Sequence, residues 1–234
     1  MEFIKKLRKY GIKKIFLYLT PEIKRFYRLI FLGSYSHLGE DLVLSKNFPT
    51  GYKGFYVDVG ANDPISKNNT YYFYKRGWRG INIEPDLVCY NKIKKVRTED
   101  INLNIGIGEV EGKVDYYSLF PSSLNTFSKK DADRSVSEGY ELLEVSKMDI
   151  RRLDEVLDEY LPPNTKFDFI SIDTEGYDLN VLKSMNIERF KPKFICFACA
   201  GNVFLEDIDI LLKENNYLKI FSNGSNTIYK YSGE

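Results

Sequence analysis

The chain has 234 residues, of which 43% are hydrophobic, and its formal net charge is +1. This length is enough for one α/β domain with an appendage, and the near-neutral charge argues against nucleic-acid binding through overall charge. Three cysteines without the spacing of a disulfide framework predict a reducing, cytoplasmic location.

Residues 1–33 form a predicted basic helical arm. Residues 1–32 hold nine Lys and Arg against two acids, a net charge of +7 that leaves −6 for the rest. Thr20 and Pro21 divide the arm into two helices, because Thr caps a helix and Pro suits its first turn. Either the arm lies on an anionic membrane surface, or it packs on its own domain or a second copy, which the scattered lysines favour. No run of about 18 apolar residues predicts a membrane span.

Strands and helices alternate through residues 34–234, which predicts a mostly parallel sheet covered on both faces. The expected strands are 54–59, 80–84, 101–107, 113–119, 167–172, 193–199, 217–221 and 226–232. The expected helices are 37–46, 66–76, 86–95, 149–160, 177–186 and 205–215. A hairpin connection before the last strand predicts an antiparallel strand at one edge. Residues 120–147 are polar and weakly periodic, which is typical of an insertion or lid.

The segment GFYVDVGAND, residues 54–63, contains the first candidate binding turn. A buried strand ends near Asp58, whose carboxylate is costly to bury without a partner, and Gly60 permits a tight turn close to a ligand. Open α/β sheets bind nucleoside-like cofactors at this point. A dinucleotide binder would carry G-x-G-x-x-G for a pyrophosphate, whereas this chain carries acids. The pattern favours a positively charged ligand with an amino-acid end, and S-adenosylmethionine fits that description.

Glu84 ends the second expected strand, one βα unit after Asp58. A carboxylate at this place accepts hydrogen bonds from both hydroxyls of a ribose. The alternative is an acid that stabilises the start of the following helix through the helix dipole. In the third expected strand, Asn102 or Asn104 is a candidate for binding the adenine edge, and the alternative is a strand residue that faces solvent.

The segment FDFISIDTEG, residues 167–176, provides two more carboxylates. The strand stops at Asp173, and Glu175 follows in the exit turn, so both face the crevice of a doubly wound sheet. They suit Mg²⁺ or Mn²⁺, or they can take the proton of a substrate hydroxyl. The alternative is that they cap the next helix, and capping does not exclude catalysis.

The ordered series GEDLVL, YVDVGAND, GWRGINIEP, DINLNIGIG and FISIDTEG, over about residues 34–232, resembles the FkbM family of S-adenosylmethionine-dependent methyltransferases. The resemblance implies a Rossmann-like class I methyltransferase fold: a mostly parallel seven-stranded sheet with an antiparallel terminal strand. It also implies methyl transfer to an oxygen. We expect the acceptor to be a hydroxyl of a sugar, either a nucleotide-activated sugar for surface polysaccharide or a glycosylated natural product.

The same resemblance assigns roles to individual residues. The residues it places at the cofactor are Asp58, Gly60, Ala61 and Asn62 at the methionine end, Glu84 at the ribose, and Tyr35, Glu40 and Asp41 around the pocket. From their own positions in the sequence, Asn104 and Asp173 are added to the residues expected to bind the cofactor. Asp173 is the first candidate for the catalytic base, Glu175 the second and His37 the third. His37 stands where the family usually has a glutamine.

Ala198 departs from the pattern of related metal-dependent sugar methyltransferases, which carry an acid at this strand end. If Asp173 holds a divalent cation, this chain lacks one ligand. Two other interpretations therefore stay open. One is a non-catalytic or impaired binding module, and the other, which only the basic arm supports, is a nucleic-acid methyltransferase. The oligomeric state is open.

Overall fold

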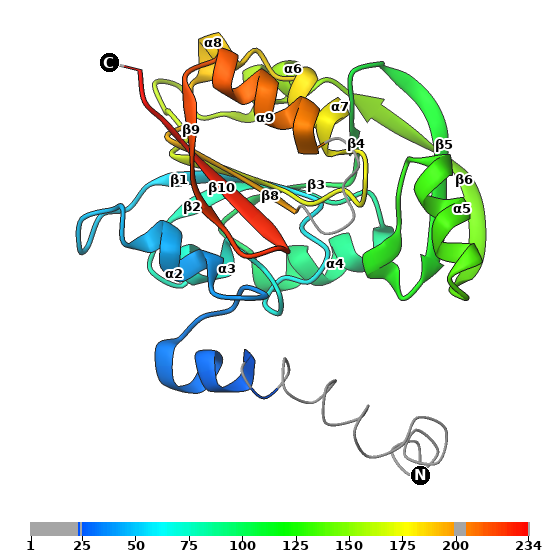
Figure 1. The fold of residues 1–234 in the computed structure, drawn as a ribbon, viewed down its shortest axis with the longest axis horizontal. Coiled ribbons are helices and arrows are strands. Elements are labelled where there is room, and N and C mark those ends of the chain that lie inside the picture. Colours follow the sequence, from blue (N-terminus) through cyan, green and yellow to red (C-terminus); the bar gives the residue numbers. More distant parts are fainter. Residues whose placement is uncertain (1–22, 24, 199–204, 234) are drawn as a thin grey trace.

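The computed structural model describes residues 23, 25–198 and 205–233. These residues form a seven-stranded sheet with helices on both faces and a three-stranded sheet beside it (Figure 1). The order of the large sheet is β3-β2-β1-β7-β8-β10-β9. Its strands are β1 (Phe55–Val59), β2 (Arg79–Ile83), β3 (Ile101–Leu103), β7 (Phe169–Ile172), β8 (Phe194–Ala198), β9 (Tyr217–Ser222) and β10 (Asn226–Tyr231).

The large sheet confirms the predicted mostly parallel arrangement with an antiparallel terminal strand. The strands β3, β2, β1, β7 and β8 run parallel, and β10 runs antiparallel to both of its neighbours. The antiparallel strand is not at the edge, however, because β10 lies between β8 and β9. The short turn before β10 folds it back along β9, and its other side pairs with β8.

Two hydrophobic clusters flank β1, because successive side chains of a strand point to opposite faces. Val57 and Val59 pack into the larger cluster with residues of the helices above the sheet in Figure 1, and Tyr56 packs with Trp78 on the other face. The helices above are α6 (Leu153–Tyr160), α7 (Asp178–Lys183), α8 (Ile187–Phe190) and α9 (Leu205–Glu214). Those below are α2 (Glu40–Ser45), α3 (Tyr71–Tyr74) and α4 (Leu87–Val96). Asp58 points to the same face as Tyr56.

The small sheet corrects the sequence prediction for residues 101–160. It consists of β4 (Gly106–Ile107), β6 (Glu141–Arg151) and β5 (Gly112–Phe120), in that order. The expected strand 101–107 is therefore divided between two sheets, and the expected helix 149–160 begins only at Leu153. The insertion 120–147 contains the short helices η2 (Ser122–Leu124) and α5 (Lys129–Ser137) and the start of β6.

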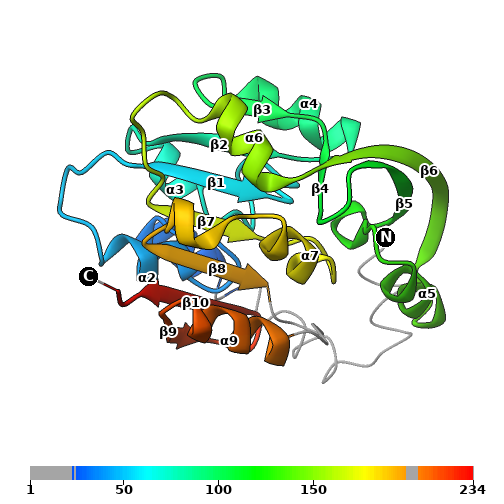
Figure 2. The same cartoon turned by 90° about the horizontal axis from the view of Figure 1, so that it is seen from above.

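Sequence patterning missed β6 because its apolar residues are not buried on one face. Leu142, Leu143 and Val145 are all exposed, and pairing with β5 rather than burial holds the strand. Figure 2 shows the small sheet and α5 beyond the carboxyl ends of β1 and β8.

The described part of the arm is a helix over 25–32 that lies outside the two layers (Figure 1). Its last part, η1 (Arg28–Leu32), is π-helical and ends at Gly33, which adopts a left-handed conformation with φ of 66°. The predicted break at Thr20 and Pro21 lies outside the described residues. Among the described helices, none is long and apolar enough to cross a membrane.

Candidate active site

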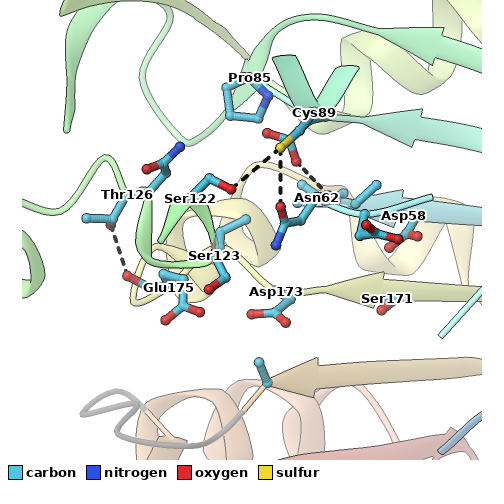
Figure 3. A pocket seen from close by; sticks show the side chains of 18 of the residues that line it. Asp58, Asn62, Pro85, Cys89, Ser122, Ser123, Thr126, Ser171, Asp173 and Glu175 are labelled. Carbon is cyan, nitrogen blue, oxygen red and sulfur yellow. Dashed lines mark hydrogen bonds between the residues drawn. The ribbon is translucent and has the colours of Figure 1, made fainter. Parts of the chain in front are cut away.

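A cavity of about 520 Å³ opens at the carboxyl ends of β1, β2, β7 and β8. Cavities of about 300–1,000 Å³ are typical of small-molecule sites. The sequence-predicted residues that line it are His37, Asp58, Gly60, Ala61, Asn62, Glu84, Asp173, Glu175 and Ala198. Figure 3 shows Asp58, Asp173 and Glu175 together with Ser122, Ser123 and Thr126 of the insertion around this cavity.

Asp58 is buried at the end of β1, where its carboxylate has protein partners. Its Oδ2 accepts hydrogen bonds from Thr70 Oγ1 at 2.8 Å and Asn68 Nδ2 at 3.1 Å. Burial raises the pKa of Asp58, while Thr70, the nearby Arg97 and Asn68 act in the opposite direction. Oδ1 accepts no hydrogen bond from the described residues, so it is free to bind a donor group of a ligand.

Arg97 supports this arrangement from behind, and sequence reasoning missed it. The guanidinium is buried and donates to Asn68 Oδ1 at 2.7 Å and to Thr70 Oγ1 at 3.0 Å, the two groups that hold Asp58. It also lies 3.6 Å from Asp100, which is buried as well. In the sequence, Arg97 follows Lys94 and Lys95 and carries no signal that separates it from surface cations.

Gly60 makes the turn after β1 possible, for a reason that the sequence did not indicate. Its φ is +80°, and a Cβ atom there would lie 1.9 Å from the backbone oxygen of Asp173. The turn after β1 therefore packs directly against the end of β7. Gly60 and Ala61 donate to the carbonyl of Ile83, which brings the Asn62 amide to the end of β2.

The Glu84 carboxylate accepts two backbone hydrogen bonds, one on each oxygen. The donors are the Asn62 amide at 2.7 Å and the Asp86 amide at 2.8 Å. Burial raises the pKa of Glu84 to about 7, although these two hydrogen bonds act against the increase. The side chain is 5% exposed and lines the cavity. It is held by the backbone on both sides and retains lone pairs that face the cavity.

Asp173 and Glu175 differ from Asp58 and Glu84, because neither carboxylate accepts a hydrogen bond from the described residues. The side chain of Asp173 is open to the cavity, yet protein surrounds it. This enclosure, and then the charges of Glu175 and Asp178, raise the pKa of Asp173 well above its usual range. Burial and then Asp178 raise the pKa of Glu175 to about 7.

The insertion supplies a polar wall of the cavity, which sequence analysis anticipated only as a possible lid. Four residues with hydroxyl or amide groups line this wall: Ser122, Ser123, Asn125 and Thr126. Thr126 Oγ1 donates to the backbone carbonyl of Glu175 at 2.9 Å and so joins the insertion to the turn after β7 (Figure 3).

Four predicted cofactor residues do not line the cavity. Glu40 accepts from Asn223, Asn226 and Leu38, and Asp41 accepts from Ser34, Ser36 and the Tyr35 amide. The Tyr35 hydroxyl accepts from Lys75, and Asn104 donates to the carbonyls of Glu84 and Pro85. Glu40 and Asn104 thus hold cavity residues, Asn226 and Glu84, from behind.

Comparison with known proteins identifies the family. The family model described as the Methyltransferase FkbM domain matches residues 58–219, which is more than half of the chain. The chain belongs to the FkbM methyltransferase family. The match includes both strand ends that carry Glu84 and Asp173.

Several solved structures are similar to this FkbM-family chain. The FkbM methyltransferase from Methylobacillus flagellatus KT is 17% identical with a TM-score of 0.50, and the match covers 80% of this chain and 46% of that one. The chain thus spans less than half the length of that relative. The TehB-like SAM-dependent methyltransferase from Corynebacterium glutamicum ATCC 13032 Kitasato is 12% identical, with a TM-score of 0.44 and coverage of 90% and 96%. The METTL16 MTase domain is 13% identical, with a TM-score of 0.43 and coverage of 84% and 66%.

A search of the curated proteins found no match.

The FkbM-family fold is that of S-adenosylmethionine-dependent methyltransferases, and the cavity residues fit this cofactor. Six carboxylate residues line the cavity against three cationic ones, Lys67, Lys92 and Arg134. The excess of acids attracts a positively charged sulfonium. The buried Glu84 at the end of β2 faces the same cavity as Asp58 at the end of β1.

A divalent cation does not fit the residues that line the cavity. At the end of β8, Ala198 presents a methyl group where an acid would be needed as a ligand. In the described residues, no three His, Cys, Asp or Glu side chains are grouped so that they could hold a metal ion. The expectation of Mg²⁺ or Mn²⁺ at Asp173 therefore gains no support, and no step of the reaction is assigned to a cation.

Proposed function

We propose that this protein transfers a methyl group from S-adenosylmethionine to a hydroxyl group of a sugar, with a nucleotide-activated sugar as acceptor. One observation carries the proposal: Asp173 and Glu175 open into the cavity without a hydrogen-bond donor from the described residues, beside the held carboxylates of Asp58 and Glu84. A cytoplasmic location, expected from the cysteines, agrees with an acceptor of this kind.

The held carboxylates bind and orient the cofactor in this proposal. Glu84 accepts the ribose hydroxyls through the lone pairs that the Asn62 and Asp86 amides leave open. The free Oδ1 of Asp58 accepts from the amino group of the methionine end, next to Gly60 and the neighbouring Ala61. When bound, S-adenosylmethionine supplies a methyl group already activated on sulfur, so the chain mainly supplies position.

The open carboxylates act on the acceptor. Asp173 takes the proton of the substrate hydroxyl as it attacks, with Glu175 and then His37 as the next candidates for this role. A pKa raised above its usual range brings a carboxylate closer to the basicity that suits a general base near neutral pH. Alignment of the reacting atoms contributes as much as about 7–11 kcal/mol, whereas a base adds about 10²–10⁴-fold in rate, so positioning dominates.

The insertion wall supports a hydroxyl-rich acceptor. Ser122, Ser123, Asn125 and Thr126 present donors and acceptors that match the hydroxyls of a sugar. Lys67 and Lys92 also line the cavity, and neither forms an ion pair with another described residue. They are the groups that would bind the diphosphate of a nucleotide sugar.

A screen of nucleotide sugars with methyl-labelled S-adenosylmethionine tests this function. The expected result is labelled sugar and release of S-adenosylhomocysteine, both strongly reduced by Asp173→Asn. Label transferred to nucleic acid instead would contradict the proposed acceptor. Calorimetric titration with S-adenosylmethionine tests the cofactor separately, because a chain that binds none is a methyltransferase-like module without activity.

A further inference from the structure

The helix that precedes the domain carries a row of unpartnered apolar side chains. Each member of the row lies three or four residues from another member, so the row shares one helix face: Ile23, Phe26, Tyr27, Ile30 and Phe31. The rings of Tyr27 and Phe31 confirm this, because their centroids are 4.8 Å apart. The exposed fractions range from 54% for Tyr27 to 68% for Phe31. A contiguous apolar surface of this kind marks an interaction site, whereas single exposed apolar residues do not.

The two arginines of the same helix contact the domain. Arg25 Nη1 donates to Ser66 Oγ at 2.8 Å, and Arg28 Nη2 donates to the carbonyl of His37 at 2.7 Å. Both arginines are half-buried, while every apolar residue over 25–32 is exposed. This helix thus contacts its own domain through its arginines, while its apolar residues stay exposed. Its polar side faces the domain, and its apolar row faces away.

Charge distinguishes between the possible occupants of the row. Residues 1–32 carry a net charge of +7. Docking one arm on the arm of a second copy would bring two such charges together, which is unfavourable. An anionic lipid surface attracts them instead. Aromatic and branched apolar residues combined with many Lys and Arg are typical of helices that lie in the headgroup region of a membrane.

We propose that residues 23–32 dock on an anionic phospholipid surface, with the apolar row placed among the lipid headgroups and the net positive charge of residues 1–32 attracted to the surface. The attachment of the helix gives this docking a consequence for the site. His37 and Ser66 accept the hydrogen bonds from the two arginines, and both residues line the cavity. Docking therefore holds that wall of the cavity close to the lipid surface.

Co-sedimentation of the full chain with vesicles tests the proposal. The protein should sediment with vesicles that contain phosphatidylserine, should be released by salt, and should stay in solution with pure phosphatidylcholine. The double variant F26S/F31S should bind at least about tenfold more weakly, because two exposed apolar anchors are lost. The matched control L218S/I220S changes two exposed residues of β9 and should bind like the unchanged chain.

Three results would overturn the proposal. The first is that the unchanged chain does not sediment with the anionic vesicles. The second is that F26S/F31S binds them as tightly as the unchanged chain does. The third is a dimer in light scattering that F26S/F31S abolishes, which would assign the row to a second copy. Calorimetric titration with S-adenosylmethionine in the absence of vesicles should give the same affinity for F26S/F31S as for the unchanged chain, which keeps this test separate from that of the methyltransferase activity.

Discussion

Two groups of carboxylates line one cavity, and they differ in the hydrogen bonds that they accept from the protein. Asp58 and Glu84, at the ends of β1 and β2, accept two hydrogen bonds each from the chain. Asp173 and Glu175, at the end of β7, accept none from the described residues. Burial raises the pKa of both, the charge of Glu175 adds to the increase for Asp173, and the charge of Asp178 adds to that for Glu175.

This difference indicates that the two groups have different roles, one in ligand recognition and one in proton transfer. A side chain that the backbone and a buried arginine hold in place can recognise a fixed ligand, because its geometry is set in advance. A carboxylate without donors keeps its basicity and can accept a proton from a substrate. We therefore expect changes in the first group to alter cofactor affinity, and changes in the second group to alter turnover.

The largest effect should come from the open group. Asp173→Asn should reduce kcat by about 10²–10⁴-fold, because the base is lost, while the cofactor Kd stays within about threefold. Glu175→Gln should reduce kcat less. Release of S-adenosylhomocysteine measures turnover, calorimetry measures Kd, and the exposed Asp133→Asn serves as control. A fully active Asp173→Asn protein would remove this residue from the chemistry.

The support behind the held group can be tested through Arg97. Arg97→Met leaves the buried Asp100 without its cation and takes the donors from Asn68 and Thr70. The free energy of unfolding should fall by about 3–5 kcal/mol in a urea titration, which is the typical cost of breaking a buried pair. The exposed pair of Arg189 and Asp158 gives the matched variant, Arg189→Met, which should lower the free energy of unfolding far less than Arg97→Met. Equal losses in the two variants would show that the network does not hold the site.

Glu84→Gln tests the held group itself. The cofactor Kd should rise by about 10–100-fold, because charge-assisted hydrogen bonds to the ribose are weakened. At saturating cofactor, kcat should change little, in contrast to Asp173→Asn. Glu99→Gln, at an exposed carboxylate paired with Arg79, should leave both quantities unchanged. A drop in kcat with unaltered Kd would reverse the roles assigned to the two groups.

The smallest effect concerns pH. With a pKa of about 7, Glu84 is mostly protonated at pH 6 in the empty protein and ionised at pH 8. Affinity for the cofactor should therefore rise by up to about tenfold over this range, since the ionised form accepts both ribose hydroxyls. For stability the sign is opposite: a raised carboxyl pKa favours the folded state at acidic pH, and this contribution disappears as pH increases through about 7. In Glu84→Gln both dependences should become weaker.

The sequence predicted the parts of the fold that depend on buried strands. Phe55–Val59 and Phe169–Ile172 are buried throughout, and their apolar runs ended where the strands end. The strand β6 escaped prediction, because it is held by pairing with β5 and shows no buried face. Similarly, the place of β10 between β8 and β9 depends on which strands pair with its two edges, and hydrophobic patterning contains no information about that pairing.

For the site, residue type and strand position were enough to bring Asp58, Glu84, Asp173 and Glu175 to one cavity. Glu40 and Asp41 were placed at the cofactor, whereas their carboxylates bind loops of the protein. Arg97 was missed for the converse reason. The partners of a charged residue depend on long-range packing, so the sequence alone does not separate a buried support from a ligand contact or a surface charge.

The most direct measurement is a crystal structure of the chain with S-adenosylmethionine. The account predicts the ribose hydroxyls on the Glu84 carboxylate, the methionine end at the turn of Gly60, and the methyl group directed toward Asp173. A cofactor bound outside this cavity, or a Glu84 side chain that does not reach the ribose, would contradict it.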